Sequence, residues 1–250
     1  MKRMAWFSGM SLLVLMVAAA WGRLHVPARL IPAELAAGIP VDCRQLVVVR
    51  VQDKDKPAAE VWLMERNRPG GRWQKVAGPM AANAGKKGVA WGRGDPDLPN
   101  PDPGKYAEKR EGDGRSPAGL FQLPFAFGAK ALPPEVRCRL PWMECTPTLR
   151  GVDDPKSRYY NLVVDESGLP DKDWDSAEIM KREDGLYDVG VMIGHNPARL
   201  PGMGSCIFLH IWKGLGEGTA GCTALSADDV RKIVAWVDPA KEPRLALAVP

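Results

Sequence analysis

Most apolar residues of this chain occur in short runs that are separated by turn residues. The segments 44–53 (RQLVVVRVQD) and 59–67 (AEVWLMERN) predict two strands joined by the polar turn 53–58. Short β segments with glycine turns continue over 71–94. Further strands are expected over 120–128, 160–164, 186–196 and 204–212. This alternation is typical of an antiparallel sheet that has one face in water.

One segment carries a helical pattern instead, residues 226–238 (SADDVRKIVAWVD). Ser226 is the expected N-cap, and two aspartates follow it in the first turn. Val230, Ile233 and Val234 recur at helical spacing, which predicts a core-facing stripe. Residues 92–119 hold almost no large apolar side chains and predict a long surface loop. The fold class that follows is mainly β, with one or two short helices.

The N-terminal segment 1–20 indicates export. Lys2 and Arg3 precede an uncharged apolar run, and Ala18 and Ala20 supply a small-x-small cleavage pattern. A cleaved signal peptide is favoured over an uncleaved anchor, which would be the only link to a membrane. Both interpretations place the remainder outside the cytoplasm. Residues 41–250 are then long enough for a single domain with one substantial core.

Charge and composition exclude several classes of function. The chain has 34 basic and 30 acidic residues, a net charge of +4, which is too balanced for a protein whose main partner is nucleic acid. Zinc-ligand spacings of the CxxC or HxxxH kind do not occur, so no metal site is expected. The serine-nucleophile motifs GxSxG and SxxK are also missing. No cofactor is predicted.

The five cysteines are an odd number, so at least one thiol must stay unpaired in an oxidising compartment. If Cys222 is the free one, the other four can pair in three ways. The sequence leaves that connectivity open. These four are Cys43, Cys138, Cys145 and Cys206.

Cys222 and His210 are the candidate nucleophile and base. A thiol has an ordinary pKa of about 8.5 and needs a base or a positive environment to react. Cys222 follows Gly221 in a turn that leads into the predicted helix, where the N–H groups of both residues can converge on an oxyanion. His210 closes an apolar strand 12 residues earlier. His195 either lines the cleft or finishes a strand as a polar residue, and the second role is favoured. A structural cysteine at 222 stays an open alternative.

Three stretches together resemble the catalytic domain of the L,D-transpeptidase family, also called YkuD-like. They are GDGRSPAGLFQL (112–123), IFLHIW (207–212) and TAGCTAL (219–225), and the similarity covers roughly residues 110–237. Each stretch alone is weak, but their order and spacing make the resemblance fairly specific. It implies a β-sandwich-like domain with a short helix, in a secreted protein of the periplasm or cell envelope.

The resemblance also implies roles for individual residues. Cys222 would attack the carbonyl of the third residue in a peptidoglycan tetrapeptide stem and expel D-alanine. His210 would act as general base and then as acid, oriented by the backbone carbonyl of Ile211. Gly221 and Cys222 would supply the oxyanion N–H groups, with Thr219 in the place of the motif's Ser or Thr. His195 and Arg199 are further candidates for substrate binding.

The acyl acceptor remains open. Attack on the thioester by the amine of a second stem would give a cross-link, attack by water would give a carboxypeptidase, and attack by a lysine of an envelope lipoprotein would give an anchored protein. Cell-wall remodelling is the process implied in each case. The expected partners are therefore peptidoglycan stem peptides and, for one acceptor, an envelope lipoprotein.

Two positions depart from the family's pattern. Ala224 stands where many members carry Arg or Asn, and Ala220 stands where some carry His. The first departure favours the main alternative, a non-catalytic envelope-binding module that keeps the fold. A structural, disulfide-bonded envelope protein is a third class. If the chain is an enzyme, another arginine is expected to replace the missing one; the candidates are Arg137, Arg139, Arg150, Arg158 and Arg199.

Overall fold

The structure is a computed structural model that describes residue 30, residues 32–132 and residues 137–248. The predicted signal peptide or anchor at 1–20 lies outside the described residues, as does His25. Within the described part of the chain, no helix is long and apolar enough to cross a membrane.

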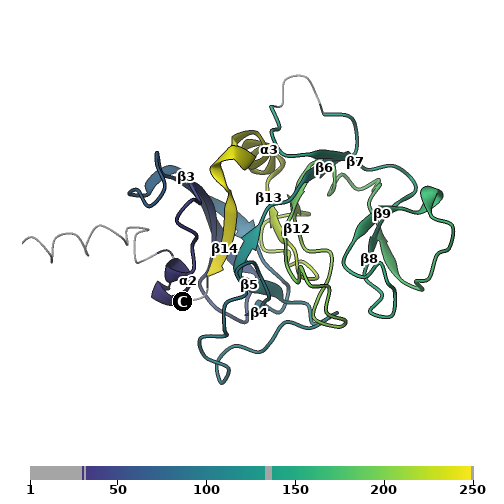
Figure 1. Cartoon of the computed structure of the whole chain (residues 1–250), viewed down its shortest axis with the longest axis horizontal. Helices are drawn as coiled ribbons and strands as arrows, with labels where there is room; N and C mark the ends of the chain where they lie inside the picture. The colour runs from purple at the N-terminus through teal and green to yellow at the C-terminus, as the bar shows by residue number, and fades with distance from the viewer. Residues whose placement is uncertain (1–29, 31, 133–136, 249–250) are drawn as a thin grey trace, which may run out of the picture.

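An eleven-stranded mixed sheet forms the body of the protein (Figure 1). Its strand order is β4-β5-β14-β1-β2-β3-β13-β12-β11-β6-β7. The strands of this sheet are β1 (Gln45–Val51), β2 (Ala58–Glu65), β3 (Gln74–Asn83), β4 (Val89–Trp91), β5 (Ser116–Gln122), β6 (Ala126–Gly128), β7 (Trp142–Glu144), β11 (Gly190–Met192), β12 (Phe208–Ile211), β13 (Thr223–Leu225) and β14 (Arg244–Ala248). The expectation of a mainly β protein with few short helices is confirmed.

The first strands form where the apolar runs predict them, but their surroundings differ from the prediction. Leu46, Val47, Val48 and Val49 are all buried, so both faces of β1 are covered. The sheet is also not purely antiparallel, because β1 pairs in parallel with β14. A continuous apolar run is typical of a strand covered on both sides, whereas alternation marks a half-exposed one.

Strand β14 was not expected from the sequence. It lies between β1 and β5, parallel to the first and antiparallel to the second. Its side chains at Leu245 and Leu247 are buried in the core. The C-terminal segment therefore joins two strands from the first half of the chain (Figure 1).

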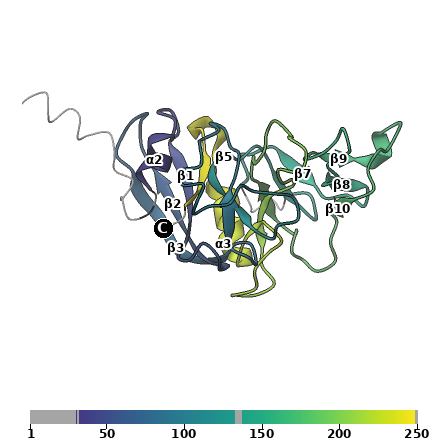
Figure 2. The same ribbon diagram turned by 90° about the horizontal axis from the view of Figure 1, so that it is seen from below.

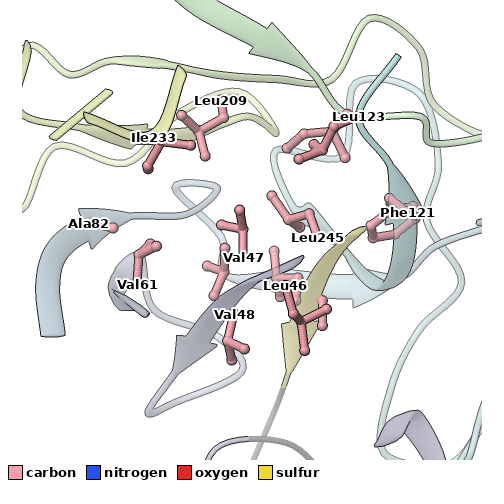
Figure 3. Packing of buried hydrophobic residues seen from close by; sticks show 14 of the residues in the cluster. Leu46, Val47, Val48, Val61, Ala82, Phe121, Leu123, Leu209, Ile233 and Leu245 are labelled. Carbon is pink, nitrogen blue, oxygen red and sulfur yellow. The ribbon is translucent and has the colours of Figure 1, made fainter. Parts of the chain in front are cut away.

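The hydrophobic core joins this sheet to helix α3 (Ala227–Trp236). Figure 3 shows Ile233 beside Leu209 on one side of the cluster and Leu245 beside Val47 at its centre. The helix begins as predicted, because Ser226 Oγ accepts a hydrogen bond from the Asp229 N–H at 3.2 Å. Its apolar stripe packs against β11 and β12. The helix thus covers the strands that carry the candidate site.

A short helix, α2 (Ala33–Ala37), precedes the first strand. The Leu35 side chain is only 2% exposed and belongs to the core cluster. The predicted domain start at residue 41 is therefore too late. The proline-flanked sequence of α2 is too short to show a helical pattern of its own.

A separate three-stranded sheet, called the small sheet below, lies at the opposite end of the molecule from β1–β3 (Figures 1 and 2). Its strands are β8 (Leu149–Val152), β9 (Val163–Asp165) and β10 (Ala177–Ile179), in the order β10-β8-β9. The predicted strand 160–164 corresponds only in part, because β9 begins at Val163.

Two side chains attach the small sheet to the body. Asn161 Nδ2 donates to the carbonyls of His195 and Asn196 at 2.8 and 2.9 Å, and Asn161 Oδ1 accepts from the Cys206 N–H at 2.8 Å. Tyr160 donates its hydroxyl proton to Glu111. Both residues precede β9, so they fix the small sheet beside the loop that leads into β12.

We predict that Leu245→Ala will lower the free energy of unfolding by about 2–5 kcal/mol, because it removes a fully buried side chain from β14 and leaves a cavity. Chemical denaturation at neutral pH measures this change. Val76→Ala on β3, whose side chain is 51% exposed, is the matched control and should change stability by less than about 0.5 kcal/mol. Equal effects of the two variants would contradict the central position of β14.

Candidate functional site

Parallel pairing of β12 with β13 determines where the candidate nucleophile and base lie. The register pairs His210 with Ala224. Cys222 precedes Ala224 by two positions, and alternate residues of an extended segment point to the same face of a sheet. Cys222 and His210 therefore face the same side, and both line one pocket of about 480 Å³.

The imidazole of His210 is held in one orientation. Its Nδ1 lies 2.7 Å from the carbonyl oxygen of Ile211, so Nδ1 carries the proton and Nε2 is left as an acceptor. The side chain is buried, and burial lowers the pKa of His210 to about 4. At neutral pH the ring is thus an uncharged base, which is the form that can take a proton from a thiol.

Tyr187 packs against the imidazole of His210. Its ring meets the ring of His210 edge-on, with centroids 5.2 Å apart and planes at 74°. The Tyr187 hydroxyl donates to Glu178 Oε1 at 2.5 Å. Sequence reasoning missed Tyr187, because a tyrosine within the apolar run 186–196 cannot be distinguished from an ordinary core residue.

The thiol of Cys222 is buried and uncharged at neutral pH. Burial raises its pKa to about 12, and the nearby charge of Glu178 acts in the same direction. The Phe208 N–H, which lies 3.3 Å from Sγ, and the cation of Lys109 oppose this shift without overcoming it. In the part of the chain that the structure describes, no hydrogen bond joins Sγ to the His210 ring.

The backbone at Cys222 is clamped by two hydroxyl groups. Thr219 Oγ1 and Ser116 Oγ both donate to the Cys222 carbonyl, at 2.6 and 2.8 Å. The Gly221 N–H, expected at an oxyanion, instead donates to Thr219 Oγ1 at 3.1 Å. Thr219 and Ser116 therefore shape the turn that presents the thiol. The sequence did not indicate this role of Ser116, although it belongs to the motif 112–123.

Gly221 is required for close packing at this turn. A Cβ atom at this position would lie 3.2 Å from the Arg115 carbonyl oxygen and 3.3 Å from Ile207 Cδ1. Both distances are shorter than ordinary van der Waals contact. A larger residue would push the turn away from the strand that carries His210.

His195 and Arg199 lie outside the lining of the Cys222 pocket, so the structure does not bring these two substrate-binding candidates together with the nucleophile. Both line a second pocket of about 350 Å³ beside Phe125. The two ring nitrogens of His195 are engaged with backbone, since Nδ1 accepts from the Arg93 N–H and Nε2 donates to the Met203 carbonyl. His195 is thus a buried polar residue that joins two loops. Arg199 is exposed, and its guanidinium donates to the Arg158 carbonyl.

The cations of the Cys222 pocket differ from those expected. The pocket is lined by Lys109, Arg182 and Lys213, and by none of the five arginines proposed to replace the missing one. Lys109 Nζ is buried and lies 2.5 Å from Asp113 Oδ1. Sequence reasoning missed it because the polar loop 92–119 predicts exposure for all its charged residues. Ala224, at the position of the missing arginine, lines the pocket with a methyl group only.

The structure holds no disulfide among the five cysteines, all of which it describes as free. The expected pairing of Cys43, Cys138, Cys145 and Cys206 is therefore not observed. Among the described residues, no group of three or more His, Cys, Asp or Glu side chains is arranged to hold a metal ion.

No protein-family model matches this chain, and neither the curated proteins nor the solved structures contain a match.

We predict that acid will destabilise the fold through its buried histidines. A histidine whose folded pKa lies below its unfolded value of 6.5 contributes stability above that value and loses it as the pH falls through about 4. For His195 this loss is about 3 kcal/mol, because its pKa is lowered from 6.5 to about 4 by burial. Denaturant unfolding at several pH values between 7 and 4 measures it. His195→Gln should have a shallower pH dependence than the wild type, and an unchanged slope would contradict the prediction.

We also predict that Cys222 is a neutral thiol at rest and is alkylated only through its small thiolate fraction. With a pKa of about 12, its thiolate fraction and its rate of alkylation by iodoacetamide should rise about tenfold per pH unit between pH 7 and 10. Peptide mapping by mass spectrometry separates Cys222 from the other thiols, and Cys222→Ala is the control. A rate that is already flat above pH 6 would instead indicate a resting thiolate–imidazolium pair.

Proposed function

We propose that this protein is a cysteine-dependent acyltransferase of the L,D-transpeptidase type, which acts on peptidoglycan tetrapeptide stems in the cell envelope. The observation that carries the proposal is that Cys222 and His210 share one face of two adjacent strands and one pocket. The hydrogen bond from His210 Nδ1 to the Ile211 carbonyl directs the second ring nitrogen away from the backbone. This is the orientation that a general base requires.

The protonation states of the site define the first step. Because the thiol and the imidazole are both uncharged, the proton of Cys222 must move to His210 Nε2 as the sulfur forms its bond to the substrate carbonyl. The tetrahedral intermediate then collapses, and the bond to the leaving D-alanine breaks. His210 returns the proton to the departing amine, which leaves a thioester on Cys222.

The pocket suits a charged peptide end. Its lining combines carboxylates, ammonium groups and the aromatic side chains of Tyr187 and Trp212. A stem peptide presents both carboxylates and an amine, so its polar groups find partners of opposite charge there. The resemblance supports export to the periplasm, through the N-terminal segment, as the setting for this reaction.

A specific observation favours the alternative, an envelope-binding module without catalysis. The pKa of Cys222 is raised to about 12, and the side chain at Ala224 offers no cation. A non-catalytic pocket would bind the same stem peptides and leave them unchanged. Acylation of the thiol distinguishes the two functions directly.

The experiment that tests the proposal is intact-protein mass spectrometry after exposure of the soluble domain to a carbapenem. The expected result is one covalent adduct, mapped to the peptide that contains Cys222. Cys222→Ala should abolish the adduct, and His210→Ala should slow its formation by at least about 100-fold, because it removes the general base. Cys206→Ala is the matched control, since Cys206 is a second buried thiol of the same pocket, and it should keep the adduct.

Three results would contradict the catalytic function. The first is the absence of any adduct, the second is an adduct on Cys206 alone, and the third is a reaction of equal rate in His210→Ala and wild type. Binding of an unmodified tetrapeptide stem without turnover, measured by calorimetry on the same preparation, would then favour the binding module.

A further inference from the structure

We propose that Glu178 binds the cationic primary amine that accepts the acyl group, and that its carboxylate takes the first proton from this amine. The inference rests on the function proposed above and names both the acceptor class and the residue that selects it. It favours a second stem or a lysine side chain over water as the acceptor.

The placement of Glu178 leaves one of its oxygens free for a ligand. Glu178 lies on β10 of the small sheet and lines the pocket of Cys222. The partners that the structure gives it, the Tyr187 hydroxyl at 2.5 Å and Arg182 Nη1 at 3.8 Å, both contact Oε1. Within the described residues Oε2 has no hydrogen-bond or ion-pair partner, so this oxygen is open to a donor from the substrate.

The charge of the pocket favours a cation. Four carboxylates and three cationic side chains line it. Lys109 is paired with Asp113, and Arg182 is paired with Asp184, so carboxylates just outside the lining already neutralise two of the three cations. An ammonium group is therefore attracted into the pocket, whereas an anionic nucleophile would be repelled.

Other carboxylates of the lining are already engaged in holding loops together. Glu111 Oε2 accepts from both the Tyr160 hydroxyl and Ser205 Oγ. Asp153 Oδ1 accepts from Ser176 Oγ at 2.5 Å. Glu178 alone among these three also contacts Tyr187, whose ring meets the ring of His210 edge-on. Its carboxylate is thus fixed relative to the reacting groups.

Glu178 is also close enough to the nucleophile to influence it electrostatically. Its charge contributes to the raised pKa of Cys222. Burial raises the pKa of Glu178 itself, which makes its carboxylate a better proton acceptor than an exposed one. Both effects support a group that stands beside the thioester and removes a proton from an incoming ammonium.

In the second half of the reaction, the acyl group passes from Cys222 to the amine. The ammonium gives one proton to Glu178 and becomes a neutral amine, whose lone pair forms the C–N bond at the thioester carbonyl. His210 takes a second proton from the attacking nitrogen. The C–S bond breaks, and His210 gives that proton to the departing sulfur, which restores the Cys222 thiol. Glu178 releases its proton to solvent, and the product is an amide.

The test measures how the acyl-enzyme partitions between amine and water. Wild type and Glu178→Gln are incubated with a tetrapeptide stem ending in D-alanine and with Nα-acetyl-lysine, whose side chain is a primary ammonium. Mass spectrometry quantifies the amide product and the tripeptide formed by hydrolysis. Glutamine keeps an oxygen for the Tyr187 hydroxyl and removes only the charge. The ratio of amide to hydrolysis product should fall at least about tenfold. Both products come from the same acyl-enzyme, so this ratio does not depend on how fast Cys222 is acylated.

Two controls separate charge from structure. Hydroxylamine is an uncharged nucleophile at neutral pH, and its capture of the acyl-enzyme should be the same in wild type and Glu178→Gln. Glu183→Gln makes the same chemical change at an exposed position outside the pocket lining, and it should leave the ratio unchanged.

The outcomes distinguish this inference from the function on which it rests. Normal acylation with an unchanged ratio in Glu178→Gln would overturn the role of Glu178 alone. An equal fall in acylation, aminolysis and hydroxylamine capture would also overturn it, because the residue would then be structural. If the wild type forms no acyl-enzyme at all, the proposed function fails and this inference fails with it.

Discussion

The parallel pairing of β12 with β13 is the constraint on which the candidate site depends. It sets the relative position of His210 and Cys222 through backbone register, so the two side chains do not rely on a flexible loop to meet. A slip of one residue would turn Cys222 to the opposite face of the sheet. The connection between the two strands is fixed by the fully buried Asn83, whose amide donates to the Gly214 carbonyl at 2.7 Å and whose oxygen accepts from the Gly216 N–H at 2.9 Å.

Burial is the second influence on the chemistry, and it shifts the pKa values of the Cys222 thiol and the His210 imidazole in opposite directions. It disfavours the charged form of each, so it raises the pKa of Cys222 and lowers that of His210. A buried pair of this kind stays neutral at rest and separates charge only as a substrate bond forms. The clamp on the Cys222 carbonyl by Thr219 and Ser116 reduces the freedom of the thiol before that event. Hydrogen bonds to the backbone thus help to position the thiol, a role that a resting thiolate–imidazolium pair can have in other sites.

The sequence predicted those parts of the fold that local patterns determine. Strands β1 and β2 have apolar runs, and helix α3 has apolar residues at helical spacing, each within a single segment. The N-cap of α3 was predicted from the serine at position 226, directly before the helical pattern. Strand β14 was missed because it forms through pairing with distant segments. The small sheet was predicted only in part, at 160–164, because its strands are too short to show a clear pattern.

The candidate site was also predicted only where the signal is local in the sequence. Cys222 and His210 were found because motif spacing is a local signal. Lys109 is far in sequence from Glu178 and Tyr187, and only tertiary structure brings all three to one pocket with Cys222. His195 was named as a substrate-binding candidate on its residue type, although the favoured interpretation was a polar residue that finishes a strand. Its ring nitrogens instead serve backbone groups at 2.9 and 3.3 Å, which a sequence cannot reveal.

The position of β14 has a consequence for how the protein acquires its structure after synthesis. Until residues 244–248 are available, β1 has no partner on one side and β5 lacks its antiparallel neighbour. The chain therefore cannot complete its sheet progressively from the N-terminus, because the β1–β14 pairing joins residues 46–50 to residues 244–248. Such long-range closure is typically slow.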